Sequence, residues 1–365
     1  MCIDMKRVLL LIGMLVASVI AGKAQDSYKI TGNVTGLPDG QLVLAVWDGQ
    51  KGVVAAKTEI TGGKFVFIGS VKEPVWAVIH TPDGQPVASF MLENAEYAVM
   101  GKDAVTGGGK AQETWMKFDA INFDLARERQ VLEAQYVQAE QQGNKKQMQK
   151  IDSAFQAFLV DIQAREVALL KQSTDNHAAA YVVASTMNGL PLARLQERFG
   201  LLSSRMQASG FGKAVAERIA KLEQLEIGAI APDFSLPSSY VGVISLHKTN
   251  ARLKLVYFWA SGDATSRVRN VELLQLHEQY RPKGLDIISV SLDVNKQEWM
   301  KAIGEDGMNG WQNGCDLQGI SSPAVQSYCV ESIPTLFLVD RENCIVGKDL
   351  WGINLRKQIT KLLKK

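Results

Sequence analysis

Residues 254–260 read KLVYFWA, and this run decides the fold of the carboxy-terminal part of the chain. A continuous apolar run without turn formers is typical of a strand that is buried on both faces of a sheet. A second run, LDIISVSL, follows at residues 285–292, and TLFLV follows at residues 335–339. Three such runs predict the buried strands of one sheet.

Helical periods separate these runs. The expected helix after the first strand has five apolar positions, namely Val268, Val271, Leu274, Leu276 and Tyr280. Trp299 and Ile303 mark a second helix, and residues 355–363 a closing one. Residues 344–346 are expected to pair with 335–339 as a hairpin. The alternation of strands and helices predicts an α/β domain over residues 227–365.

The residues before this domain form two segments with different sequence patterns, the first typical of strands and the second of helices. Residues 25–105 hold short β-branched and aromatic runs between Gly, Pro and Asp turns, which predicts an antiparallel β-sandwich domain. Residues 110–225 are helical in period. Two apolar stripes with Gly143-Asn144 between them predict a long helical hairpin: Phe118, Ile121, Leu125, Leu132 and Tyr136, then Met148, Ile151, Phe155, Phe158 and Ile162. The hairpin either buries its own seam or binds a partner, such as a second copy.

Residues 1–24 have the features of an export signal. Lys6-Arg7 precede the apolar run of residues 8–20, VLLLIGMLVASVI, and small residues flank Lys23. This pattern predicts cleavage after Ala24, with an uncleaved anchor as the alternative. No later run reaches transmembrane length. The mature chain is therefore expected in the periplasm or associated with the cell envelope.

Composition narrows the class of protein further. The chain has 365 residues, of which 46% are hydrophobic and 21% charged, and its formal net charge is +2. Lys6, Arg7 and Lys23 against Asp4 account for that +2, so the rest is neutral. Residues 25–365 have no net charge and lack the clustered cations that phosphate binding needs, so we expect no nucleic-acid partner.

Four motifs occur in a characteristic order in the carboxy-terminal part: APDFSL at 231–236, FWAS at 258–261, VSLD at 290–293 and SIPTLFL at 332–338. In these residues the domain resembles the thioredoxin-fold proteins of the TlpA/ResA and AhpC/TSA type, which are envelope thiol:disulfide oxidoreductases and peroxiredoxin relatives. The β-sandwich and helical region are similar to the region that precedes such domains in many bacterial envelope proteins. The resemblance implies a thioredoxin-like fold and a role in cell redox homeostasis.

The chemistry of that family needs a Cys-x-x-Cys pair just after the FWAS strand. Aligned on that strand and on Arg267, the two positions are Asp263 and Ser266 here, and neither can carry out exchange by thiolate attack on sulfur. Asp at a helix start favours a capping role. The alternative is a general base, for which no histidine partner is in reach, because His277 lies 14 residues further on.

The resemblance also assigns a role to Pro334. It implies that the Ile333-Pro334 bond is cis and that this loop faces the degenerate active-site positions. In the family the loop offers backbone hydrogen bonds to an extended peptide. A docking groove for a protein or extended peptide could therefore persist without the thiols.

Three cysteines remain after the signal, at Cys315, Cys329 and Cys344. In an oxidising compartment they form either one disulfide, Cys315–Cys329, with one free thiol, or three buried thiols. Their spacings of 14 and 15 residues fit no zinc motif, so we expect neither metal nor cofactor.

Two functions follow from these features. The favoured interpretation is a redox-inactive binding protein of the envelope, a pseudoenzyme with the thioredoxin fold. The alternative is a thiol-disulfide oxidoreductase or antioxidant protein that uses Cys315, Cys329 or Cys344.

Overall fold

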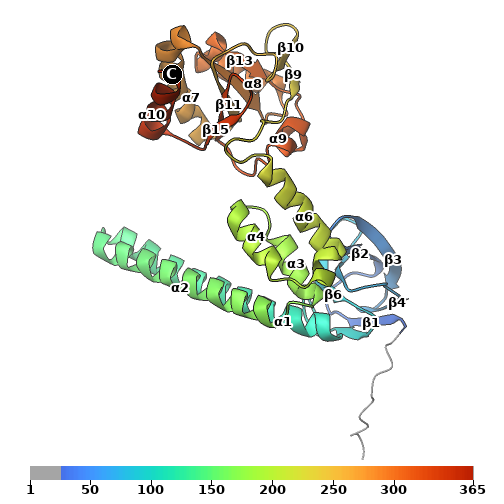
Figure 1. The fold of residues 1–365 in the computed structure, drawn as a ribbon. Coiled ribbons are helices and arrows are strands. Elements are labelled where there is room, and N and C mark those ends of the chain that lie inside the picture. The colour runs from blue at the N-terminus through green and yellow to red at the C-terminus, as the bar shows by residue number, and fades with distance from the viewer. Residues whose placement is uncertain (1–25, 365) are drawn as a thin grey trace, which may run out of the picture. The chain divides into compact units, whose positions relative to one another are not determined.

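The computed structural model describes residues 26–364 (Figure 1). Residues 1–24, the predicted signal peptide, lie outside the described residues. The described chain forms two compact units. The first holds the residues up to Val182 together with Leu201–Phe211, and the second holds Val183–Gly200 and the residues from Gly212 onward.

Eight strands open the first unit. They are β1 (Tyr28–Asn33), β2 (Gly40–Trp47), β3 (Gly52–Ile60), β4 (Lys64–Gly69), β5 (Val75–His80), β6 (Pro86–Leu92), β7 (Glu96–Val99) and β8 (Val105–Gly107). They form two four-stranded sheets, in the orders β4-β1-β7-β8 and β3-β2-β5-β6. One apolar cluster takes side chains from both sheets, including Ile30, Leu44, Phe67, Ile79 and Phe90. The predicted β-sandwich is confirmed.

The sandwich departs from the prediction at two places. β1 and β7 pair in parallel, with Ile30 opposite Tyr97, so the sandwich is not purely antiparallel. The chain reaches β7 only after β6, an edge strand of the other sheet, and β7 then runs beside β1 in the same direction. β3 was not predicted, because it is an edge strand that pairs only with β2 and leaves most of its residues exposed. Exposure removes the alternation by which a strand is found in sequence.

A helical hairpin follows the sandwich. α1 (Lys110–Gln141) and α2 (Lys145–Gln172) pack side by side along their length (Figure 1). The turn lies where it was predicted: Gly143 has φ 64°, and the Asn144 side chain caps α2 by accepting the backbone N–H of Gln147 at 3.1 Å. Phe118, Ile121, Ile151 and Ile162 are buried, so the two apolar stripes face the hairpin's own seam.

Four shorter helices connect the hairpin to the carboxy-terminal domain. They are α3 (His177–Ser185), α4 (Leu192–Gly200), α5 (Ser204–Ala208) and α6 (Gly210–Glu223). α3 and α6 each begin in the first unit and end in the second. The one-turn α5, capped by Ser203, was not predicted, because five residues are too few to show a helical period.

The second unit is built on a five-stranded sheet. Its elements are β9 (Ser235–Pro237), β10 (Val243–Ser245), β11 (Leu253–Trp259), α7 (Ala264–Tyr280), β12 (Leu285–Ser291), α8 (Lys296–Glu305), β13 (Gln312–Gly314), α9 (Pro323–Ser327), β14 (Thr335–Asp340), β15 (Ile345–Lys348) and α10 (Gly352–Leu363). The strand order is β13-β12-β11-β14-β15, with β9 and β10 as a separate hairpin. β11, β12 and β13 are parallel, whereas β14 runs antiparallel to both neighbours.

Both faces of this sheet are covered, as the sequence of β11 predicts. Leu255, Tyr257 and Trp259 belong to one apolar cluster, which includes side chains of α7, α8 and α10. Val256 and Phe258 belong to the other, which includes α9 and the β9–β10 hairpin. The strand is fully buried and helices cover both faces of the sheet, which confirms the α/β architecture predicted for this domain.

The inner face of α7 differs from the prediction. Val268 and Val271, expected to be buried, are 70% and 54% exposed, whereas Asn270 and His277 are buried. Asn270 donates to Asp306 at 2.7 Å, and His277 packs edge-on against the Trp311 ring. Polar contacts of this kind leave no apolar period in the sequence.

Within residues 26–364, the helices lack a segment with the length and apolarity needed to cross a bilayer.

Candidate functional site

The loop between β11 and α7 and the first turn of α7 hold the two positions that the resemblance aligns with the family's cysteine pair, Asp263 and Ser266. Asp263 is the N-cap of α7, with φ −91° and ψ 113°, and its carboxylate accepts the backbone N–H of Ser266 at 2.6 Å. The cap expected from the residue type is therefore formed. A carboxylate at this point also interacts favourably with the positive end of the helix dipole.

Ser266 lies one turn further on and is fully buried. Its hydroxyl has no hydrogen-bond partner among the described residues, and its carbonyl accepts the hydroxyl of Tyr257 at 3.0 Å. Burial raises the pKa of the Tyr257 hydroxyl. A buried hydroxyl that no base contacts is not an activated nucleophile.

A second carboxylate fixes the start of this loop. Asp293, which follows β12 and is nine-tenths buried, accepts the Ser261 hydroxyl at 2.6 Å and the Ser261 backbone N–H at 3.0 Å. It also accepts the hydroxyl of Ser291 at 2.6 Å. Sequence reasoning identified Asp293 only as part of a family motif. Its role is to join the ends of β11 and β12, because one carboxylate satisfies donors from both loops.

The proline loop lies beside this loop at the same edge of the sheet. β14 pairs with β11 in a register that places Phe258 opposite Thr335, so the residue before Thr335 lies next to the end of β11. That residue is Pro334, and the Ile333-Pro334 bond is cis, as the resemblance implied. Ile333 and Pro334 are half-buried. The register therefore places Pro334 next to the end of β11, from which the chain continues into the loop that holds Asp263.

The three cysteines are placed elsewhere and are free thiols. Cys315 is 3% exposed and belongs to the apolar cluster on the α7 face, whereas Cys329 packs against the cluster on the opposite face. The Cys315–Cys329 bridge, one of the two alternatives, is not formed, because the sheet lies between the two clusters. Of the alternatives left open by the sequence, three separate thiols is the one present, although Cys329 and Cys344 are only half-buried.

The surroundings of Cys315 and Cys329 do not activate these two thiols. Burial raises the pKa of Cys315, whose sulfur donates to the carbonyl of Asp293 at 3.4 Å. Burial also raises the pKa of Cys329, although Arg218 and Lys221 act in the opposite direction. A reactive thiol needs a depressed pKa and access to solvent, and Cys315 has neither.

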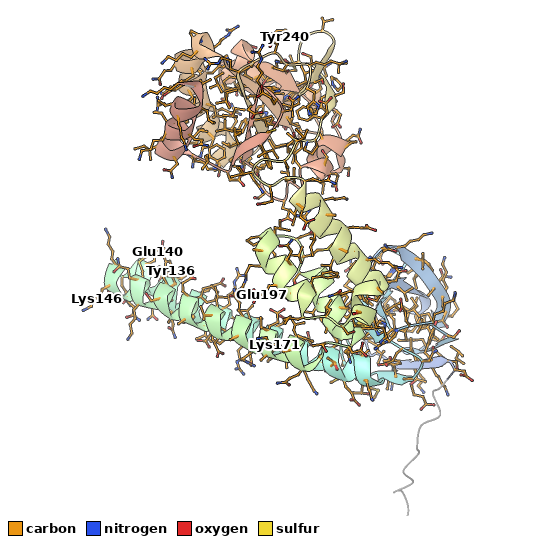
Figure 2. All side chains as sticks on the ribbon, in the orientation of Figure 1. Tyr136, Glu140, Lys146, Lys171, Glu197 and Tyr240 are labelled. Atoms are coloured by element: carbon orange, nitrogen blue, oxygen red, sulfur yellow. The ribbon has the colours of Figure 1, made fainter. Side chains whose placement is uncertain are left out.

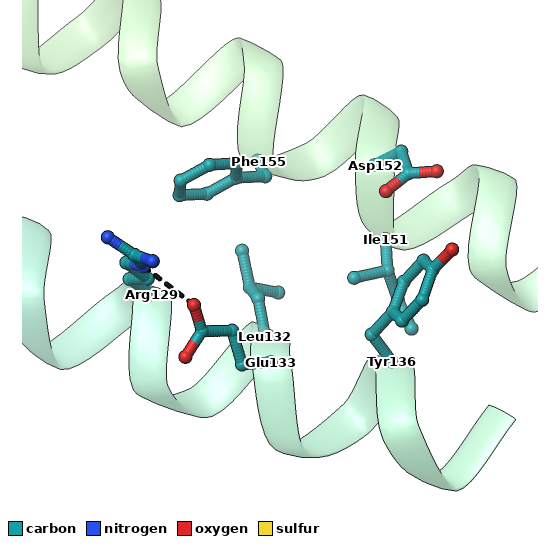
Figure 3. Close-up of a pocket in the computed structure, with 7 residues that line it drawn as sticks. All are labelled: Arg129, Leu132, Glu133, Tyr136, Ile151, Asp152 and Phe155. Carbon is teal, nitrogen blue, oxygen red and sulfur yellow. Dashed lines mark hydrogen bonds and ion pairs between the residues drawn. The ribbon is translucent and has the colours of Figure 1, made fainter. Parts of the chain in front are cut away.

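The described residues contain no group of three or more His, Cys, Asp or Glu side chains that could hold a metal ion. A hollow of about 250 Å³ does lie in the seam of the helical hairpin (Figure 3). Leu132, Tyr136, Ile151 and Phe155 line it, and the Arg129–Glu133 ion pair stands at its rim. Asp152 also lines the hollow, so its lining is mainly apolar with charged side chains at the rim, and it offers packing surface.

Comparisons with known proteins agree with this description. Residues 250–346 match the family model described as thioredoxin-like, and residues 28–115 match a domain of unknown function, DUF4369. No curated protein gives a significant match.

Several solved structures align with the carboxy-terminal domain. One is the carboxy-terminal domain of a proposed thiol-disulfide oxidoreductase from Bacteroides thetaiotaomicron, which is 32% identical in sequence. The alignment covers 38% of this chain and 97% of that chain, with a TM-score of 0.36. Another is a thiol-disulfide oxidoreductase from Bacteroides fragilis, with 30% identity, coverage of 36% and 98%, and a TM-score of 0.34. A thioredoxin domain from Bacteroides vulgatus has 30% identity, coverage of 38% and 98%, and a TM-score of 0.36.

Proposed function

Since this chain belongs to the thioredoxin-like family and is related to thiol-disulfide oxidoreductases, we propose that it is a redox-inactive member that binds an extended peptide of a partner protein. The observation that carries this proposal is the Asp263 cap. Its carboxylate is engaged with the Ser266 N–H at the place where the family needs a thiolate. The neighbouring cis-proline loop supports peptide docking, because its half-buried residues leave surface open to a partner.

Peptide docking is testable with a substitution that adds bulk to the β11–α7 loop. Gly262 lies in the β11–α7 loop, is exposed, and has nothing within 4 Å of an added Cβ. A tryptophan there adds bulk without forcing the fold to adjust. Gly200 at the end of α4 is equally open and serves as the matched control.

The binding experiment measures fluorescence anisotropy of dye-labelled, cysteine-free twelve-residue peptides with the full chain. We expect saturable binding that Gly262→Trp weakens by about ten-fold or more, a free-energy change of ~1.4 kcal/mol, with Gly200→Trp unchanged. An absence of saturable binding would contradict the proposal. So would equal affinities for the wild type and the Gly262→Trp variant.

The alternative function is an oxidoreductase that uses Cys315, Cys329 or Cys344, and it receives no support from the surroundings of Cys315 and Cys329. It makes a distinct prediction nonetheless. Activity in reducing insulin disulfides should be present in the wild type and lost when all three are replaced by serine.

A second contact surface is proposed on α1 of the hairpin, with a second copy of the chain as its occupant. Met116, Phe123 and Val137 are separated by multiples of seven residues and are 50%, 67% and 50% exposed. The seven-residue spacing places these side chains in one row on the side away from the hairpin seam, where an exposed apolar row offers packing surface to a second helix. Tyr136, Glu140 and Lys146 mark the end of the hairpin where α1 meets α2 (Figure 2). Sedimentation should show a dimer at micromolar concentration, and Phe123→Glu should yield a monomer; a wild-type monomer would refute this surface.

Export to the envelope is likewise a proposal, and it rests on residues 1–24. Mass spectrometry of the protein from its natural cell should find an amino terminus at Gln25 in the envelope fraction. A chain that retains Met1 in the cytoplasm would contradict it.

A further inference from the structure

The segment just before the cis-proline is held by a contact that the sequence did not indicate. Glu331 lies two residues before Ile333, and its carboxylate accepts hydrogen bonds on both oxygens. The Arg218 guanidinium in α6 donates to Oε1, and the backbone N–H of Gly189, between α3 and α4, donates to Oε2. All three residues belong to the second unit.

This contact is partly shielded from water. The side chain of Arg218 is 14% exposed and that of Glu331 is 31% exposed. The Nε atom of Arg218 is buried and has no hydrogen-bond partner among the described residues. Glu331 is therefore the group that compensates the buried charge of Arg218. Removing one partner of such a pair leaves the other uncompensated, which is costlier than losing an exposed ion pair.

Apolar packing joins the same two elements. Leu225, just after α6, is 1% exposed and belongs to the cluster that contains Val325 and Tyr328 of the α9 region. Ile333 packs against this cluster as well. The end of α6 and the proline loop therefore share one core, with the Arg218–Glu331 pair at its edge.

We propose that Glu331 is a positioning residue for peptide docking: through Arg218 and Gly189 it fixes the proline loop in the conformation that accepts a peptide. This inference rests on the proposed function. It adds that Gly189 and Arg218 control the conformation of the proline loop through their contacts with Glu331. The physical reason is preorganisation, because a loop that is already ordered loses less conformational entropy when a peptide binds.

The test compares Glu331→Gln, Arg218→Met and the double variant with the wild type. Glu226→Gln is the matched control, because it removes a different ion pair of the second unit, with Lys348 at 3.1 Å. Hydrogen exchange followed by mass spectrometry reports loop order directly, in fragments that cover residues 186–191 and 328–336. Anisotropy with the labelled peptides reports affinity.

We expect exchange about ten-fold faster in those two fragments for each single variant, with fragments of β11 unchanged. The double variant should resemble the singles, because both residues act through one contact. Peptide affinity should fall by about three-fold or more, while Glu226→Gln matches the wild type in both measurements.

Unchanged exchange in both fragments would overturn the inference, whatever the peptide affinity. Faster exchange with unchanged affinity would also overturn it, because the loop order would then not serve binding. Failure of the wild type to bind any peptide would instead contradict the proposed function. The exchange rates alone would then decide whether Glu331 orders the loop.

Discussion

The carboxylate of Asp263 accepts the backbone N–H of Ser266 at 2.6 Å, across the two residues that separate the positions aligned with the family's cysteine pair. The Asp263 side chain therefore caps the amino terminus of α7, at the position where the family has a reactive thiol. In a thiol enzyme the positive end of the helix stabilises a thiolate, whereas here it stabilises a carboxylate that is already hydrogen-bonded.

Loss of this cap should destabilise the protein. Asp263→Ala removes the acceptor for the Ser266 N–H and is expected to lower the free energy of unfolding by about 1 kcal/mol. Asp263→Asn retains an acceptor oxygen and should stay close to the wild type. Urea unfolding measures both variants, and equal stability of the Asp263→Ala variant and the wild type would show that the cap is unimportant.

Restoring sulfur at both positions should restore exchange chemistry. Asp263→Cys with Ser266→Cys places two thiols three residues apart at a helix start, where the dipole lowers the pKa of the first. We expect an intramolecular disulfide after oxidation and measurable reduction of insulin. Each single substitution should lack both properties. A folded double variant that forms no disulfide would show that these are not the former active-site positions.

The cysteine thiols should differ in reactivity. Cys315 is buried and its pKa is raised by burial, so its reaction with a disulfide reagent should be at least about a hundred-fold slower in the folded chain than in urea. Variants that keep one cysteine each allow the rates to be assigned. A folded-state rate for Cys315 equal to that in urea would contradict the buried placement.

The stability of the first unit should depend on pH through His177. Burial lowers the pKa of this 7%-exposed imidazole, although Glu73 at 3.3 Å acts in the opposite direction. The unfolded chain then binds more protons than the folded chain, so the free energy of unfolding should fall as pH drops below about 6.5. His177→Gln should remove this part of the pH dependence. An unchanged pH profile in the variant would refute the assignment.

The sequence predicted those features that depend on local patterns. The buried strand at residues 254–260, the Gly143-Asn144 turn and the Asp263 cap each follow from a few neighbouring residues, and the structure contains all three. Features that depend on distant residues were missed. The Glu331–Arg218 pair spans 113 residues, and no local pattern indicates it.

The errors have the same physical origin. Val268 and Val271 have the spacing of a buried face but are exposed, because contacts of Asn270 and His277 with distant residues set the rotation of α7. The sequence could not decide between a Cys315–Cys329 bridge and three free thiols, because sequence spacing does not show on which face of a sheet each thiol lies.

The most direct test of the central claim is the rate at which the wild-type mature chain reduces insulin disulfides, measured beside the variant with all three cysteines replaced by serine. We predict that both proteins stay at the rate of dithiothreitol alone, because neither Asp263 nor Ser266 can attack a disulfide. A wild-type rate clearly above that background, lost in the serine variant, would contradict the account and identify a thiol enzyme.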